Sequence, residues 1–108
     1  MNLVNQVITT TGAATPVALD WLANPFNATV QVVIVSGATA TYGVEYTLDN
    51  IMTTPTASVR WTSDAGSLPP GTTASGNISY TSPRAAVRCN VTALTGGNIE
   101  FKVAQGTQ

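Results

Sequence analysis

The stretch Ser36–Asn50, SGATATYGVEYTLDN, decides the fold of this 108-residue chain. From Ala40 to Leu48 every second residue is apolar, and the residues between them are polar or small. Side chains alternate between the two faces of a β-sheet, so this spacing predicts a strand with one buried and one exposed face. Neither face carries a reactive group, which indicates a scaffold rather than a site of chemistry.

The same apolar–polar alternation recurs in short segments along the chain, separated by Gly, Pro and Asn. Signals for helices are nearly absent, and the abundant Val, Ile and Thr favour a pleated surface. The segments predicted as strands are 17–21, 26–35, 40–48, 57–62, 78–80, 85–93 and 99–103, with 3–10 as a less regular candidate. Seven or eight short strands predict an all-β, single-domain antiparallel β-sandwich, jelly-roll-like. We expect residues 13–108 to form this domain and residues 1–12 to form an N-terminal arm or edge strand.

Turn-forming residues predict how these strands are connected. Asn24-Pro25 breaks the chain, and Ser36-Gly37 predicts that segments 26–35 and 40–48 form a hairpin. Gly96-Gly97 predicts a second, closing hairpin. Pro69-Pro70-Gly71 excludes regular structure within Ser63–Gly76, which we therefore expect to be a loop.

In each predicted strand, the apolar residues at alternate positions face inward, and together they are predicted to form the hydrophobic core. Buried aliphatic or aromatic side chains contribute roughly 1.5–3 kcal/mol each before conformational entropy is subtracted. The predicted core residues are Val17, Leu19, Phe26, Val30, Val32, Ile34, Tyr42, Val44, Tyr46, Leu48, Val59, Trp61, Ile78, Val87, Cys89, Val91, Ile99, Phe101 and Val103.

The low charge content is the most unusual global property of the chain. Charged residues make up 8% and the net charge is −1, whereas soluble domains contain about 25% charged residues. A neutral surface favours self-association, so we expect the protein to work inside an assembly. The four basic residues are too few and too scattered to bind nucleic acid. The longest aliphatic run, Val32–Val35, is far shorter than the ~20 residues that cross a bilayer, so no membrane partner is expected.

Catalytic and metal-binding residues are not expected. The sequence has no histidine, so the common Ser or Cys triads are unavailable, and a single cysteine without histidine excludes a structural zinc. Cys89 has inward parity and is expected to be a buried hydrophobe. Glu45 and Asp49 share one strand face at roughly 13 Å, beyond the ~5–9.5 Å of a glycosidase pair. We therefore expect neither an enzyme nor a cofactor.

Aromatic and basic residues each have two interpretations. Trp21 and Trp61 lie on the apolar parity of their segments, which favours core packing, while the alternative is a platform on which a sugar stacks. Arg84 and Arg88 have outward parity. They are expected either to bind an acidic partner surface or simply to keep the protein soluble.

Two stretches and one dipeptide resemble a group of small tailed-phage virion proteins. They are SGATATYGVEYTLDN, the pair Arg60-Trp61, and GNISYTSPRAAVRCNVTALTGGNIEFKVAQ at residues 76–105. That group shows a similar order: a Gly-Thr-Ala-Thr-Tyr strand, a Tyr-Thr-Leu-Asp turn, a tryptophan, an Ala-x-Arg-x-Asn-Val-Thr-Ala strand and a closing hairpin. Here the last strand motif is Ala86–Ala93, in which Cys89 stands where an aliphatic residue is expected. The resemblance covers roughly residues 25–105.

The resemblance implies a capsid decoration or cement protein, which binds the outer head surface as a dimer or trimer and stabilises it. Its partner would be the major capsid protein or another virion protein. The protein would be synthesised in the host cytoplasm, which agrees with one unpaired cysteine and with the absence of a secretory signal at the start of the chain. Expected contact elements are the loop Ser63–Gly76 and a set of interface residues, namely Leu3, Val4, Val7, Ile8, Arg84 and Arg88. The alternative is a carbohydrate-binding or receptor-binding module of a tail fibre or spike.

Overall fold

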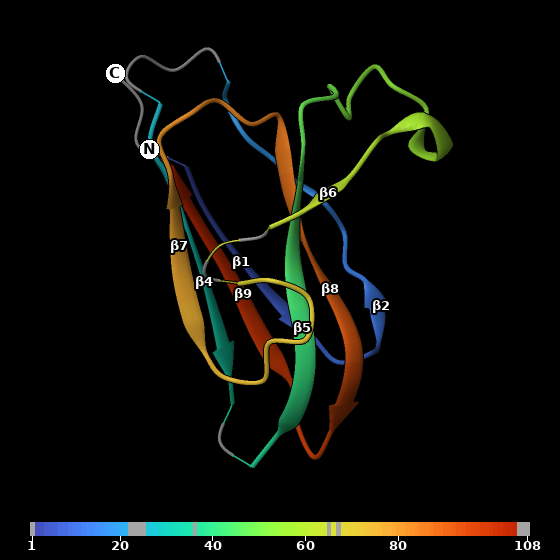
Figure 1. Ribbon diagram of the computed structural model, residues 1–108, viewed down its shortest axis with the longest axis vertical. Coiled ribbons are helices and arrows are strands. Elements are labelled where there is room, and N and C mark those ends of the chain that lie inside the picture. The colour runs from blue at the N-terminus through green and yellow to red at the C-terminus, as the bar shows by residue number, and fades with distance from the viewer. Residues whose placement is uncertain (1, 22–25, 36, 65, 67, 106–108) are drawn as a thin grey trace.

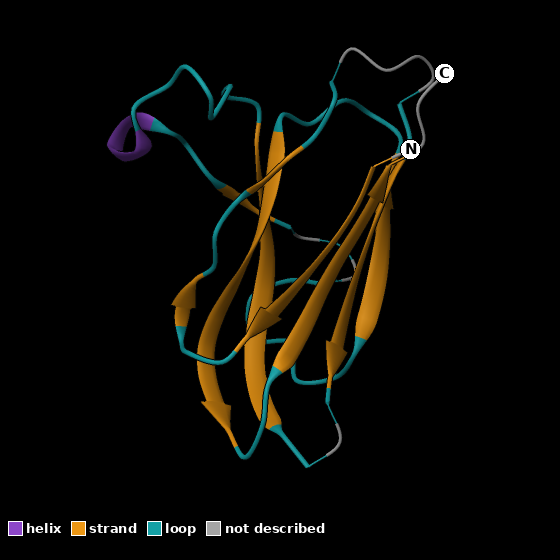
Figure 2. Cartoon of the chain, turned by 180° about the vertical axis from the view of Figure 1, so that it is seen from behind, coloured by secondary structure: helices purple, strands orange, loops and turns teal. Residues whose placement is uncertain are grey.

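The structure, a computed structural model, describes residues 2–21, 26–35, 37–64, 66 and 68–105. It is all-β: two antiparallel sheets pack against each other as a β-sandwich, which confirms the predicted fold class (Figure 1; Figure 2). A short 3-10 helix, η1 (Thr56–Ser58), lies outside the sheets. The strands within the described residues are β1 (Asn2–Ile8), β2 (Gly12–Ala13), β3 (Val17–Ala18), β4 (Ala28–Ile34), β5 (Thr39–Thr47), β6 (Thr62–Ser63), β7 (Gly76–Tyr80), β8 (Ala86–Thr95) and β9 (Ile99–Gln105).

The strand order places the two ends of the sequence in one sheet. Sheet A has the order β1-β9-β4-β7, and sheet B has the order β2-β8-β5-β6, with β3 also paired to β8. The chain therefore runs along one edge of sheet A as β1 and then crosses to pair with the outer edge of β8. No helix among these residues is long and apolar enough to cross a membrane.

The core lies between the sheets, where the period-two pattern places its apolar residues. Along β9, Ile99, Phe101 and Val103 are buried, and the register sets Phe101 beside Val32 of β4 and Val103 beside Val30. Most of the predicted core is confirmed as buried: Val17, Leu19, Phe26, Val30, Val32, Tyr42, Val44, Val87, Cys89, Val91, Ile99, Phe101 and Val103. Ile34, Tyr46 and Ile78 are partly buried against it.

Some core predictions are wrong. Leu48 is 71% exposed because β5 ends at Thr47, so strand parity no longer applies to it. Trp21 is 38% exposed because β3 ends at Ala18, well before it. Val59 and Trp61 are only half-buried, because the predicted strand 57–62 is instead η1 followed by irregular chain and the two-residue β6.

Both predicted hairpins are also wrong, because each connection crosses between the sheets. β4 already has β9 on one edge and β7 on the other, so no edge remains to which β5 can pair. β5 pairs instead with β8 in sheet B, and the next strand, β9, returns to sheet A beside β4. The predicted break at Asn24-Pro25 and the residue Ser36 lie outside the described residues.

The two sheet-crossing connections lie side by side at one end of the sandwich. The Val35 amide donates to the Asn98 carbonyl at 3.2 Å, which ties the first connection to the second. Gly37 and Gly96 both have positive φ, +91° and +77°. A Cβ added at Gly96 would lie 2.8 Å from the Gly37 carbonyl oxygen, so the close approach requires glycine there.

The segment predicted as a loop, Ser63–Gly76, is attached along the outer edge of β5. The Asp64 amide donates to the Val44 carbonyl, and the Val44 amide donates in turn to the Leu68 carbonyl. Leu68 is 1% exposed and belongs to the core, which its place in a loop did not predict. A Cβ at Gly43 would lie 2.8 Å from the Pro70 Cα. This segment therefore covers the edge of sheet B; Ala65 and Ser67 lie outside the described residues.

One irregularity in β8 changes which residues face the core. Thr41 pairs with Ala93 but Tyr42 pairs with Val91, so Thr92 is an extra residue in the ladder. Such a β-bulge reverses the parity beyond it. Leu94 consequently packs against the core, although alternation continued from Val91 would turn it outward.

Candidate binding surfaces

A cluster of three side chains lies on the outward side of sheet B, where β5 and β8 run next to each other. Glu45 and Arg88 are directly opposite in the register. The Arg88 Nε donates to Glu45 Oε1 at 2.6 Å, and both side chains are largely covered. The Arg88 guanidinium also lies 4.2 Å from the centre of the Trp61 ring, a cation–π contact. Arg88 is thus held in a fixed position by its own chain.

A groove of about 430 Å³ adjoins this cluster. One wall is the connection from β2 to β3, and the other is the long excursion between β5 and β6, residues 48–61, referred to below as the 48–61 excursion. Its lining includes Pro16, Ile51, Val59, Trp61 and Arg88. A mostly apolar hollow with one oriented charged group is the usual make-up of a small-ligand site.

The 48–61 excursion extends away from both sheets, with η1 at its far end (Figure 1; Figure 2). Asn50 accepts the hydrogen bonds that hold the turn of this excursion: the Met52 amide donates to Asn50 Oδ1, and the Thr53 and Thr54 amides donate to the Asn50 carbonyl. At its base, Asp49 Oδ2 accepts from the Arg60 amide at 2.7 Å. Leu48 and Met52 in this segment are exposed, Met52 to 79%. Sequence reasoning missed this segment because its second half was predicted as a strand.

Arg84 is also engaged within the chain. Its guanidinium lies 4.3 Å from the centre of the Tyr46 ring and 4.9 Å from that of Tyr80. Its Nη1 donates to the Ser82 carbonyl at 3.1 Å. Arg88 lies on the outward side of β8, as its parity predicted. Arg84 precedes β8, so strand parity does not apply to it, and it packs against Tyr80 of the core and Tyr46 beside it. Both arginines connect neighbouring segments of the domain.

The predicted interface residues in β1 divide by parity. Leu3 is 70% exposed and Val7 is 58% exposed, so both are available to a partner. Val4 is half-buried against the core. Ile8 is buried between the sheets, because β1 is paired with β9 and Ile8 lies on the same inward face as Val4. Ile8 is therefore unsuited to contact a partner.

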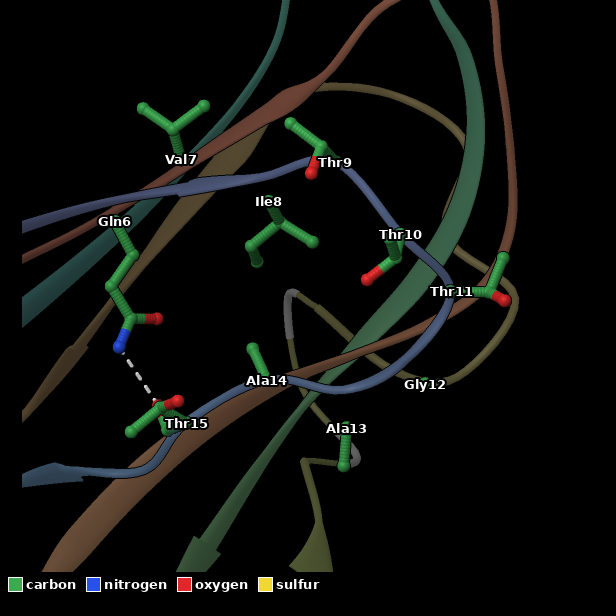
Figure 3. Close-up of a pocket in the computed structure, with 10 residues that line it drawn as sticks. All are labelled: Gln6, Val7, Ile8, Thr9, Thr10, Thr11, Gly12, Ala13, Ala14 and Thr15. Atoms are coloured by element: carbon green, nitrogen blue, oxygen red, sulfur yellow. Dashed lines mark hydrogen bonds between the residues drawn. The ribbon is translucent and has the colours of Figure 1, made fainter.

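Figure 3 shows a second hollow, of about 400 Å³, in the connection from β1 to β2. Residues 6–15 line it, and they include no ionisable side chain. Gln6 Nε2 donates to the Thr15 carbonyl at 2.8 Å across its mouth. Hydroxyl, amide and methyl groups supply the rest of the surface, so the hollow offers no acid or base.

Carboxylates in the described part of the chain do not gather into a metal-binding group. Asp64 is buried and accepts hydrogen bonds from the amides of Gly66 and Leu68, at 3.1 and 2.9 Å. Glu100 forms an exposed ion pair with Lys102 at 3.4 Å. Glu45 and Asp49 bond to other segments of the fold, Asp64 holds its own turn, and the Glu100–Lys102 pair lies within β9.

Cys89 is fully buried beneath sheet B, as its parity predicted. Burial, and to a smaller extent the nearby Glu45 carboxylate, raises the pKa of its thiol from 9.0 to about 12. Burial likewise raises the pKa of Tyr42 and of Tyr80 to about 12. A reactive thiol needs a lowered pKa and exposure, so Cys89 is not suited to act as a nucleophile.

These raised pKa values predict that the protein loses stability in alkali. Unfolded chains lose these protons at lower pH than the folded protein, so stability is complete below about pH 9 and falls towards pH 12. Urea unfolding midpoints at several pH values measure the decline. Cys89→Ala should flatten it between about pH 9 and 10, where the cysteine titrates before the tyrosines in the unfolded chain. An unchanged slope in that variant would contradict the burial of a protonated thiol.

Comparisons with protein-family models, with curated proteins and with solved structures found no match.

Proposed function

We propose that this protein is a structural component of a phage virion, a decoration or cement protein that binds the outer head surface. The resemblance of residues 25–105 to small tailed-phage virion proteins supports this role, as does a neutral surface with 8% charged residues. The observation that carries it is the 48–61 excursion, which extends away from the β-sandwich (Figure 2) and in which Leu48 and Met52 are exposed. Exposed apolar side chains on an ordered extension are suited to contact another protein.

In this role the protein acts only by binding to the shell. The excursion buries Leu48 and Met52 against a shell subunit, while the packed sheets keep its base in position. Each contact is small, but a head carries many copies, and linked weak contacts add up to high avidity. The partner is the major capsid protein or another virion protein at the head surface.

Adding the purified protein to heads stripped of it tests this role. We expect the wild-type protein to bind back and to raise the melting temperature of the heads. Met52→Asp should weaken binding at least tenfold, because it places a charge at the apolar contact. Gln31→Asp is the matched control, since it adds the same charge on the exposed face of β4 in the other sheet and should bind as the wild type does. Heads that remain unchanged after saturating addition would overturn the proposal.

A carbohydrate-binding role is the second candidate, favoured by the groove beside Trp61. Trp61 and Arg88 both line this groove, and Arg88 is held by its ion pair with Glu45. Sugars bind by stacking on aromatic rings while polar planar groups contact their hydroxyls. A glycan array with the wild-type protein and Trp61→Ala separates the two roles. Selective binding that Trp61→Ala abolishes would favour the carbohydrate role, and a flat profile would dismiss it.

A further inference from the structure

The outer edge of β1 is the longest sheet edge that the described chain leaves uncovered. β1 is the terminal strand of sheet A, with β9 on its inner side, and it is seven residues long. The backbone amides and carbonyls along a free edge are ready to pair with another strand. The edge therefore needs either protection or an occupant.

Natural edge strands are usually protected by charged side chains, proline, a bulge or extreme shortness. β1 has none of these: its sequence, NLVNQVI, is uncharged and lacks proline, and its pairing with β9 is continuous over all seven residues. The other edges differ. β2, β3 and β6 are two residues long. The free edge of β5 is covered by hydrogen bonds to Asp64, Leu68 and Thr72 and by the close approach of Pro70 to Gly43. β7 is shorter and begins with Gly76-Asn77, which are poor strand formers.

The side chains of β1 are complementary to a second β1 strand running antiparallel. Asn5 is the midpoint of Asn2–Ile8, so a two-fold axis beside it pairs every residue of the strand with a residue of the other copy. In this register Leu3 lies opposite Val7 of the other copy, and Val7 opposite its Leu3. The two most exposed apolar side chains of β1 thus cover each other, and Asn5 lies opposite Asn5. No like charges meet along the seam, because the strand has none.

We propose that two copies of this protein pair through their β1 strands, antiparallel and centred on Asn5, so that the two A sheets join into one eight-stranded sheet. The partner at this edge is a second copy of the chain, because β1 is complementary to itself when the two strands run antiparallel. The dimer leaves the 48–61 excursion of each copy on the other sheet, free to contact a shell. This inference does not depend on what the excursion binds.

Cysteine cross-linking under mild oxidation tests the dimer and its register together. Residues directly opposite in an antiparallel pair have Cα atoms about 4.5–5.5 Å apart, within the roughly 4.4–6.8 Å span of a disulfide. We expect Asn5→Cys to form a covalent dimer with itself. Leu3→Cys alone should not, because the two substituted positions are separated by roughly 13 Å along the seam. A mixture of Leu3→Cys and Val7→Cys should form the mixed dimer.

The native Cys89 does not interfere, since it is fully buried. Light scattering of the wild-type chain should give twice the monomer mass of 11.1 kDa. Val7→Lys, which adds an edge charge at an exposed position, should give a monomer. Its urea midpoint should not depend on protein concentration, whereas the midpoint of the dimeric wild type should rise with concentration. A monomeric wild type, an Asn5→Cys variant that stays monomeric under oxidation, or self-cross-linking of Leu3→Cys would each overturn the proposal. These measurements use the purified protein without phage heads. Failure of the dimer proposal can therefore be told apart from failure of the proposed binding to heads.

Discussion

Leu68→Ala is expected to lower the free energy of unfolding by about 2–5 kcal/mol, the range for leucine-to-alanine changes in protein cores. Leu68 is 1% exposed although it lies in an irregular segment, and its carbonyl accepts a hydrogen bond from the Val44 amide. The substitution removes a side chain that fills the space beside β5. A domain of this size has only about 5–15 kcal/mol of stability, so the loss would be severe. Urea unfolding followed by tryptophan fluorescence measures it.

Leu48→Ala is the matched control, because it makes the same chemical change at an exposed position. We expect its free energy of unfolding to stay within about 0.5 kcal/mol of wild type. The pair also separates two accounts of the fold, since strand parity extended from β5 places Leu48 in the core and residues 63–76 in an unattached loop. Equal losses at the two positions, or a larger loss at Leu48, would contradict the structure.

Gly96→Ala is expected to have the next largest effect. Alanine at positive φ is strained by about 1–2 kcal/mol, and its Cβ would also lie 2.8 Å from the Gly37 carbonyl oxygen. That contact is between backbone groups of the two adjacent sheet-crossing connections, so relief requires one connection to shift. Overpacking of this kind adds about 1–3 kcal/mol.

Gly71→Ala is the control for Gly96→Ala, because it introduces the backbone strain without the steric contact. Gly71 also has positive φ, +90°, but no atom lies within 4 Å of an added Cβ. Urea unfolding should therefore show a smaller loss for Gly71→Ala than for Gly96→Ala, with the difference in the range of the overpacking term. Equal losses would mean that the two connections do not meet.

Local pattern was sufficient for the long strands but not for the short ones or for strand pairing. The alternation along β4, β5, β8 and β9 identified these strands and most of their buried residues, because a two-residue period is a property of each strand alone. Pairing depends on all strands at once. Ser36-Gly37 and Gly96-Gly97 are equally compatible with a hairpin and with a crossing between sheets, and only the occupied edges of β4 decide between them.

The same limit applies to the candidate surfaces. Outward parity of Glu45 and Arg88 followed from their own strands, but their ion pair depends on the register between β5 and β8. The contact of Trp61 with Arg88 could not be predicted from the sequence, because segment 57–62 was predicted as a strand. The exposure of Met52 and the burial of Leu68 both occur in irregular chain, where no period relates sequence to burial.

We propose that this β-sandwich works by adhesion at the surface of a phage head. Cryo-electron microscopy of intact particles from the source of this chain is the most direct test. We expect density for the sandwich outside the shell, with the 48–61 excursion against a capsid subunit and β1 strands of two copies side by side. Particles that lack the protein, or that carry it only in the tail, would contradict it.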